Sequence, residues 1–265
     1  MSIISPKTKL FGIIGNPISH SLSPLIHNQA FKQLALDAVY LPFLVKYDEQ
    51  NIISALKCLN ISGANVTLPY KSLIIPQLDY VDPFAQKINS VNTIVNIDGS
   101  WQGYSTDGAG FLRALAKDSH TIKGKSVLML GAGGAAKALA HTLINEGVAE
   151  LYILNRTKKT ALSLISQLDS RAKIYENQAF EVLINATSLG LNGELACSKD
   201  LIAKAELVLD LIYNPAETKL LKLAKSLNKN VQNGLPMLIH QAAISFEYFT
   251  KQAYPPSLMD NLLKG

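Results

Sequence analysis

Several polar residues in the first half of the chain have the types and spacing needed to bind and protonate a small molecule. Period-two alternation puts Asn65 and Thr67 on one face of a short strand, and Lys71 follows just past its end. Two hydrogen-bonding groups and a cation would then point to one place. The amide of Asn92 and the carboxylate of Asp107 follow further along the chain, although each of these stretches taken alone also reads as a turn.

A loop rich in hydroxyl groups precedes this set. Residues 16–24 follow an apolar stretch and end at a helix start, where Pro24 suits the first helical position. Ser21 and Ser23 could hold a carboxylate there. Equally, Ser23 could cap the helix while the rest of the loop forms turns.

The middle of the chain carries a glycine turn that fits dinucleotide binding. Residues 131–136 read Gly-Ala-Gly-Gly-Ala-Ala, between an apolar strand and a helix. Gly131 would permit the tight turn, Gly133 would let the backbone approach a pyrophosphate, and the helix N–H groups would face the anion. A purely structural turn is the alternative, but the strand, the helix and the next strand all follow in register.

The end of that next strand favours NADP over NAD. Enzymes that use NAD usually place an acidic residue there, whereas this chain has Asn155, Arg156 and Thr157, followed by Lys158 and Lys159. Arg156 can pair with a 2′-phosphate through two N–H groups and stack on adenine. A solvated basic helix start is the alternative, although cations are disfavoured at a helix N-terminus.

The elements that must position these groups alternate between strand and helix. We expect an α/β fold of two domains: an N-terminal α/β substrate domain, built from residues 1–106 plus 234–265, and a Rossmann-like doubly wound NADP-binding domain from residues 107–233. Asp98-Gly99 predicts a hairpin turn, and the helix at 238–250 should pack back on the first domain. Strands are expected at 10–14, 39–45, 64–68, 91–97, 101–104, 126–130, 150–155, 182–186, 207–212 and 230–232, and other helices at 23–34, 48–59, 109–116, 135–146 and 158–168.

Composition excludes several other classes of protein. The 265 residues are 48% apolar and 17% charged, which allows a large core, and the net charge of +5 is spread over scattered residues rather than one stripe. We therefore expect no nucleic-acid partner. No apolar run is long enough for a membrane helix, and residues 1–10 lack an apolar block, which predicts a cytoplasmic protein. Cys58 and Cys197 are far apart in the sequence, and we predict that both are buried and pack as apolar residues. Neither the cysteines nor the dispersed histidines suggest a metal site.

Taken together, the motifs resemble the shikimate dehydrogenase family, within the shikimate/quinate dehydrogenase superfamily, over nearly the whole length. The matching segments are Gly15-Asn16-Pro17 with Ser21-x-Ser23-Pro24, Asn65-Val66-Thr67 with Lys71, Val91-Asn92-Thr93, Thr106-Asp107-Gly108, Gly131 to Gly134, Asn155-Arg156-Thr157, Asn185-Ala186-Thr187-Ser188, Asp210 with Tyr213, and Gly234 with Gln241. The resemblance implies reversible reduction of 3-dehydroshikimate with NADPH, in the shikimate pathway of aromatic amino acid (chorismate) biosynthesis.

The resemblance also implies a role for each matching residue. Lys71 and Asp107 would form the catalytic pair at the reacting oxygen. Ser21 and Ser23 would hold the substrate carboxylate with Tyr213 near it, and the ring hydroxyls would be bound by Asn65, Thr67, Asn92, Asp107 and Gln241. The implied cofactor residues are Gly131, Ala132, Gly133, Gly134, Ala135, Asn155, Arg156, Thr157, Thr187, Leu211 and Gly234.

Three positions depart from the family pattern. Ser105 stands where asparagine is common, Pro236 replaces a usual glycine, and Thr160 occupies the place of a second arginine found in some members. NADP selectivity then depends on Arg156, helped by Lys158 or Lys159.

Two other functions are open at this point. One is a quinate or dual quinate/shikimate dehydrogenase that uses NAD(P), and the other is a non-catalytic sensor of NADPH and a metabolite. A sensor has no need for a proton donor at Lys71, but a purely structural Lys71–Asp107 salt bridge is also possible. The oligomeric state, monomer or homodimer, is not indicated.

Overall fold

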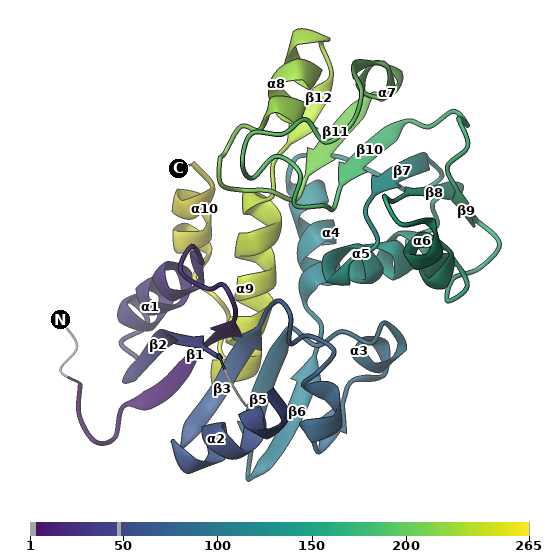
Figure 1. The fold of residues 1–265 in the computed structure, drawn as a ribbon. Helices are drawn as coiled ribbons and strands as arrows, with labels where there is room; N and C mark the ends of the chain where they lie inside the picture. Colours follow the sequence, from purple (N-terminus) through teal and green to yellow (C-terminus); the bar gives the residue numbers. More distant parts are fainter. Residues whose placement is uncertain (1–3, 47–48, 265) are drawn as a thin grey trace. The chain divides into compact units, whose positions relative to one another are not determined.

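The computed structural model of the chain describes residues 4–46 and 49–264, so the predictions that include residues 1–3 and Asp48 lie partly outside the described residues. The chain divides into two compact units (Figure 1): unit 1 comprises Met1–Gly110 and Ile239–Gly265, and unit 2 comprises Phe111–Leu238. The predicted domain boundaries lie a few residues earlier. Both unit boundaries fall inside helices, α4 (Asp107–Lys117) and α9 (Leu235–Thr250).

Unit 1 is built on a mixed six-stranded sheet of order β2-β1-β3-β5-β6-β4. Its first three positions are parallel, whereas β5 runs antiparallel to both of its neighbours. The elements outside α4 and α9 are β1 (Lys9–Gly15), α1 (Ser23–Gln33), β2 (Ala38–Leu44), η1 (Glu49–Asn51), α2 (Ile52–Cys58), β3 (Ile61–Val66), η2 (Ile75–Gln77), β4 (Tyr80–Val81), α3 (Pro83–Lys87), β5 (Thr93–Ile97), β6 (Ser100–Tyr104) and α10 (Pro256–Lys264).

The predicted return of α9 to unit 1 is confirmed by its aromatic contacts. The ring of Phe249 lies 5.2 Å from that of Phe11 in β1, and Phe246 lies 5.4 Å from Phe31 in α1. A side chain at Gly63 would meet the Phe249 ring at 3.0 Å, so glycine in β3 permits this close approach. The predicted hairpin is also confirmed, since Asp98 and Gly99 have φ of 50° and 90° between β5 and β6.

Unit 2 has an all-parallel sheet of order β12-β11-β10-β7-β8-β9, the doubly wound arrangement predicted from the sequence. Alternate side chains of the central strands β7, β8, β10 and β11 face two separate cores. Residues of α4, α5 and α6 pack on one face, and those of α7 and α8 pack on the other. The elements are β7 (Ser126–Leu130), α5 (Gly134–Asn145), β8 (Glu150–Leu154), α6 (Lys158–Ile165), β9 (Ala172–Ile174), β10 (Val182–Asn185), α7 (Lys199–Lys204), β11 (Leu207–Asp210), α8 (Lys219–Ser226) and β12 (Asn230–Gln232).

Two local predictions are wrong. Ser23 does not cap α1: the cap position is Leu22, without a side-chain hydrogen bond, and Ser23 is already helical because Pro24 sets the first turn. Cys58 is exposed rather than buried, since it is the last residue of the short helix α2. Cys197 is partly buried, and both cysteines are free.

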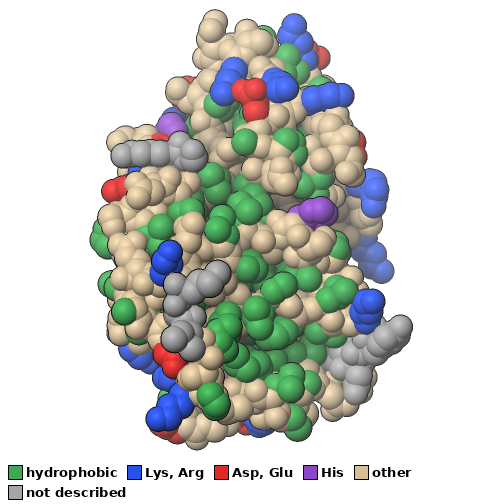
Figure 2. Space-filling view, turned by 90° about the vertical axis from the view of Figure 1, so that its left-hand side faces the viewer, with side chains coloured by type: hydrophobic (Ala, Val, Ile, Leu, Met, Phe, Trp, Pro, Cys, Tyr) green, Lys and Arg blue, Asp and Glu red, His purple; other side chains and the backbone are tan. Residues whose placement is uncertain are grey.

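The surface and the helices bear on which partners the protein could have. On the face drawn in Figure 2, lysine and arginine side chains are scattered among other types and form no continuous stripe. None of the helices in the described part of the chain is long and apolar enough to cross a membrane.

Candidate functional site

One edge of the unit 1 sheet gathers most of the polar residues predicted to bind substrate. Strands β1, β3 and β6 end at this edge and the antiparallel β5 begins there, as the pairs Asn65–Thr93 and Thr93–Tyr104 show. Loops at the ends of these strands therefore converge. This convergence explains how residues distant in sequence reach one site.

Lys71 and Asp107 form an ion pair at this edge. The Nζ atom of Lys71 lies 2.6 Å from Oδ2 of Asp107, and the two side chains are 16% and 9% exposed. Asp107 is the first residue of α4, where the helix dipole favours a carboxylate. The pair retains some access to solvent, which a group that transfers protons needs. A fully buried salt bridge would have no such access.

Asn92 fixes the other oxygen of the Asp107 carboxylate. Its Nδ2 donates to Asp107 Oδ1 at 2.8 Å, and its Oδ1 accepts the backbone N–H of Thr106 at 2.8 Å. The backbone donor determines which way the amide faces. Gln241 of α9 completes the group, with its Oε1 at 3.3 Å from both Asn92 Nδ2 and Thr106 Oγ1.

Asn65 lies deeper, at 5% exposure. Its Nδ2 is within 3.1 Å of three acceptors: the Asn92 carbonyl, Thr93 Oγ1 and Ser245 Oγ. Its Oδ1 accepts the Tyr40 hydroxyl at 2.7 Å. Both amide hydrogens are therefore used inside the protein, and only a lone pair of Oδ1 is left for a substrate hydroxyl.

The remaining predicted substrate residues are divided between the units. Ser21 and Ser23 follow β1, and the Ser21 hydroxyl accepts the Ser23 N–H at 3.2 Å. Thr67 directly follows β3, with its N–H bonded to the carbonyl of Ile14 at 2.8 Å. Tyr213 belongs to unit 2, where burial raises the pKa of its hydroxyl.

In unit 2 the glycine turn has the backbone geometry that a dinucleotide requires. Gly131 has φ of 103°, and a Cβ there would lie 2.9 Å from Thr187 Cγ2. At Gly133 a Cβ would meet no protein atom within 4 Å, so the space beside the turn is open. Gly133 is also the N-cap of α5 and no side chain caps that helix, which leaves its first N–H groups available to an anion.

The basic residues predicted to select NADP lie next to this turn. The Gly131 N–H bonds the carbonyl of Leu154, the last residue of β8, at 2.8 Å. Arg156 follows two residues later and is exposed, as are Lys158 and Lys159. Asn155 donates to the carbonyl of Thr157 at 3.0 Å, which shapes the start of α6. These residues fit a phosphate-bearing adenosine.

A buried polar group holds the neighbouring strand ends. Asp210 accepts hydrogen bonds from Asn185 Nδ2 at 3.0 Å and Thr218 Oγ1 at 2.6 Å, while Asn185 Oδ1 accepts from Thr187 at 2.7 Å. Burial raises the pKa of Asp210 in spite of these bonds. Gly234, predicted to lie near the nicotinamide, donates to the Ile212 carbonyl, and a side chain there would overlap the carbonyl of Leu211.

Four residues of the unit 1 network received no role from the sequence, although two of them, Thr93 and Thr106, stand in the matching segments; the other two are Tyr40 and Ser245. The signal for Ser245 was its spacing of four from Gln241 in α9, which places both on one face of the helix. Tyr40 gave no signal, because a tyrosine within a strand is most often a core residue.

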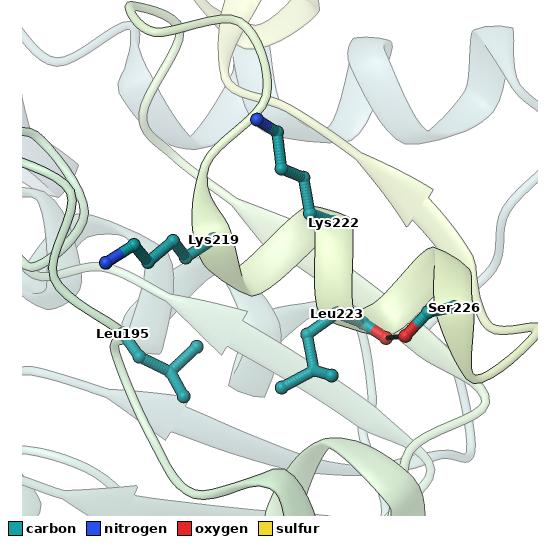
Figure 3. Close-up of a pocket in the computed structure, with 5 residues that line it drawn as sticks. All are labelled: Leu195, Lys219, Lys222, Leu223 and Ser226. Carbon is teal, nitrogen blue, oxygen red and sulfur yellow. Dashed lines mark hydrogen bonds between the residues drawn. The ribbon is translucent and has the colours of Figure 1, made fainter.

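A hollow of about 400 Å³ on unit 2 contains none of the predicted site residues. Leu195, Lys219, Lys222, Leu223 and Ser226 line it. Figure 3 shows Leu195 and Leu223 facing each other, while the Lys222 side chain extends away from both. Within residues 4–46 and 49–264, no group of three or more His, Cys, Asp or Glu side chains could hold a metal ion.

A dinucleotide-type glycine turn in one unit and a Lys–Asp pair among amide and hydroxyl side chains in the other define an NADP-dependent oxidoreductase that acts on a CH–OH group. The chain belongs to the shikimate dehydrogenase family. Residues 13–94 match the shikimate dehydrogenase substrate binding domain, residues 114–191 match shikimate/quinate 5-dehydrogenase, and residues 234–264 match the shikimate 5′-dehydrogenase C-terminal domain.

Individual relatives agree over nearly the full length. A shikimate dehydrogenase (NADP(+)) of Caldanaerobacter subterraneus subsp. tengcongensis is 40% identical over 276 aligned residues, covering 99% of both chains. The solved shikimate dehydrogenase of Aquifex aeolicus has a TM-score of 0.91 at 37% identity, covering 99% of this chain and 100% of that chain. The shikimate 5-dehydrogenase of Thermus thermophilus, in complex with NADP(H) and shikimate, has a TM-score of 0.86 at 35% identity, covering 97% and 98%.

Proposed function

We propose that this protein is a shikimate dehydrogenase that reversibly reduces 3-dehydroshikimate to shikimate with NADPH, in the biosynthesis of aromatic amino acids. The observation that carries the proposal is the Lys71–Asp107 pair with Asn92 bonded to it, set at the convergent strand ends of unit 1. The relatives named shikimate dehydrogenase (NADP(+)) support the substrate and the cofactor.

The residues of unit 1 would share the recognition of the substrate. Ser21 and Ser23 would donate to its carboxylate, because they follow β1 at the edge where α1 begins. Thr67, Asn92, Asp107 and Gln241 would bond the ring hydroxyls, and Asn65 would contribute its remaining Oδ1 lone pair. Each hydroxyl then has its own partner, so that an analogue with a different hydroxyl pattern would leave polar groups unpaired.

Lys71 would supply the proton. Reduction places negative charge on the former carbonyl oxygen, and a proton donor aimed at that oxygen lowers the barrier. The Asp107 carboxylate holds the ammonium group in one position, and Asn92 keeps that carboxylate from rotating. In the reverse direction Lys71 would take the hydroxyl proton.

The residues of unit 2 fit NADP. Bound NADPH would supply the hydride. The open space at Gly133 and the uncapped N-terminus of α5 suit the pyrophosphate, and Arg156 suits the 2′-phosphate. Thr187, Leu211 and Gly234 would form the nicotinamide end, and the family resemblance assigns Tyr213 to the substrate carboxylate. We also infer a cytoplasmic protein, where the two free cysteines would stay reduced.

The test is to follow NADPH or NADH formation when the purified protein receives shikimate or quinate with NADP or NAD. We expect shikimate with NADP to turn over fastest. Faster turnover of quinate with NAD would instead make the protein a quinate dehydrogenase. No turnover with any pair, together with retained NADPH binding, would favour a non-catalytic sensor.

A further inference from the structure

The buried hydroxyl of Ser245 connects four parts of unit 1. Its Oγ lies 3.0 Å from Asn65 Nδ2, 2.8 Å from Thr93 Oγ1 and 3.2 Å from Thr106 Oγ1. It also donates to the carbonyl of Gln241 at 2.9 Å. Strands β3 and β5, the residue before α4, and helix α9 therefore meet at one oxygen atom, which is fully buried.

The count of hydrogens limits which of these bonds can form at the same time. A serine hydroxyl has one hydrogen, and the Gln241 carbonyl can only accept, so that hydrogen is committed to Gln241. The oxygen of Ser245 then accepts from Asn65 Nδ2 and has one further lone pair for a threonine hydroxyl, that of Thr93 at 2.8 Å or that of Thr106 at 3.2 Å. The hydrogen of each threonine hydroxyl has other acceptors as well, since Thr93 Oγ1 lies 3.1 Å from Asn92 Oδ1 and Thr106 Oγ1 lies 3.3 Å from Gln241 Oε1. The threonine oxygens face the donors around them.

Two of those donors are the amide groups that the active site depends on. Asn92 Nδ2 donates to Thr106 Oγ1 at 2.9 Å, and Asn65 Nδ2 donates to Thr93 Oγ1 at 3.1 Å. Asn92 also donates to the carboxylate of Asp107. A change at Ser245 would therefore reach Asp107 through a threonine and an asparagine, without any contact with substrate.

Tyr40 constrains the same network from the opposite side. Its hydroxyl donates to Asn65 Oδ1, which forces the amide nitrogen of Asn65 to face Ser245 and Thr93. The ring of His27 stacks on Tyr40 with centroids 4.4 Å apart, and this packing restricts the rotation of the tyrosine side chain. The packing around Tyr40 thus holds its hydroxyl in position to donate to Asn65.

We propose that Ser245 is a positioning residue for the Asn92–Asp107–Lys71 set, and that Tyr40 is a second one acting through Asn65. Neither side chain would touch substrate or cofactor. Both would hold the proton-donating pair in the orientation that the reaction needs. The inference rests on the proposed function, because it assigns these residues to the same reaction.

The test compares three variants with the wild-type protein. Ser245→Ala removes the shared acceptor from a helix that tolerates alanine well, and Tyr40→Phe removes only a hydroxyl. Thr250→Ala is the matched control, since Thr250 also lies in α9 and makes the same hydrogen bond to the carbonyl four residues earlier, at 2.8 Å, but does not contact the network. Titration with shikimate in a calorimeter counts the binding-competent sites of each variant.

We expect kcat per competent site to fall about tenfold in Ser245→Ala and about threefold in Tyr40→Phe, the scale of one lost buried hydrogen bond. The KM for shikimate should change less than about threefold, and Thr250→Ala should match the wild type in both constants. Two results would overturn the proposal: an unchanged kcat per competent site in both network variants, or a raised KM with normal kcat. Wild-type turnover of shikimate is measured first, so failure of the proposed function is recognised separately.

Discussion

The two units use different kinds of chemical group at their predicted sites. In unit 1 the groups predicted to do chemistry are side chains, and most of them are buried and bonded to one another. In unit 2 the glycine turn offers backbone N–H groups and open space, and its basic residues are exposed. A proton must be delivered to one atom, which demands rigid side chains, whereas a pyrophosphate is satisfied by any well-placed N–H groups.

The largest effect should come from removing the proton donor of unit 1. Lys71→Ala is expected to lower kcat/KM by between about 10² and 10⁴-fold, the usual contribution of a positioned acid. NADPH binding, measured by fluorescence titration, should stay within a factor of about two. Lys87→Ala, which changes an exposed lysine of the same unit, is the control. Equal loss in both variants would show that charge, not position, matters.

The two glycines of the turn should separate folding from binding. Gly131→Ala is expected to lower Tm and weaken NADPH binding, because its φ is positive and a Cβ would press on Thr187. Gly133→Ala meets no protein atom, so its Tm should stay normal while the intruding methyl group weakens NADPH binding about a hundredfold. Thermal unfolding and NADPH titration test both. Normal NADPH affinity in Gly133→Ala would mean that the pyrophosphate does not approach the turn.

Removal of an exposed cation should have a smaller effect than the loss of Lys71 or a change at either glycine of the turn. Arg156→Ala is expected to raise KM for NADP about tenfold and to leave KM for NAD unchanged, since only NADP carries the 2′-phosphate. Lys199→Ala is the matched control: another exposed cation at the start of a helix of unit 2. If KM rises equally for both dinucleotides, Arg156 contacts a part common to the two.

The smallest effect concerns the pH dependence of stability in unit 1. Burial lowers the pKa of His27 from 6.5 to about 3, so the native state binds fewer protons than the unfolded state between these values. Stability from this group is complete above about pH 6.5 and falls as the pH decreases, by about 2 kcal/mol at about pH 5. In His27→Phe this loss should disappear. Denaturant unfolding at both pH values measures it, with exposed His20→Gln expected to behave as the wild type.

The sequence predicted the glycine turn of unit 2 and its flanking elements more completely than the side-chain network of unit 1. The turn, α5 and β8 are neighbours in the chain, so local patterns reveal them directly. The sequence also singled out Asn65, Asn92 and Asp107, but the residues that orient them come from β2, β5 and α9, which only the tertiary fold brings together. Short elements such as β4, α3, β9 and α7 were not predicted, because they contain too few residues to show a full period of the hydrophobic pattern.

Unit 1 is discontinuous in sequence, and this sets the order in which a ribosome can complete the two units. All of unit 2 emerges before most of α9, so its sheet can form while synthesis continues. The first part of unit 1 must wait for the end of the chain, which brings Gln241, Ser245 and Phe249. Until then Asn65 and Thr93 lack their contact with the Ser245 hydroxyl, and the aromatic core lacks the rings of Phe246 and Phe249. A chain truncated at the start of α9 should therefore bind NADPH through unit 2 but carry an incomplete substrate site.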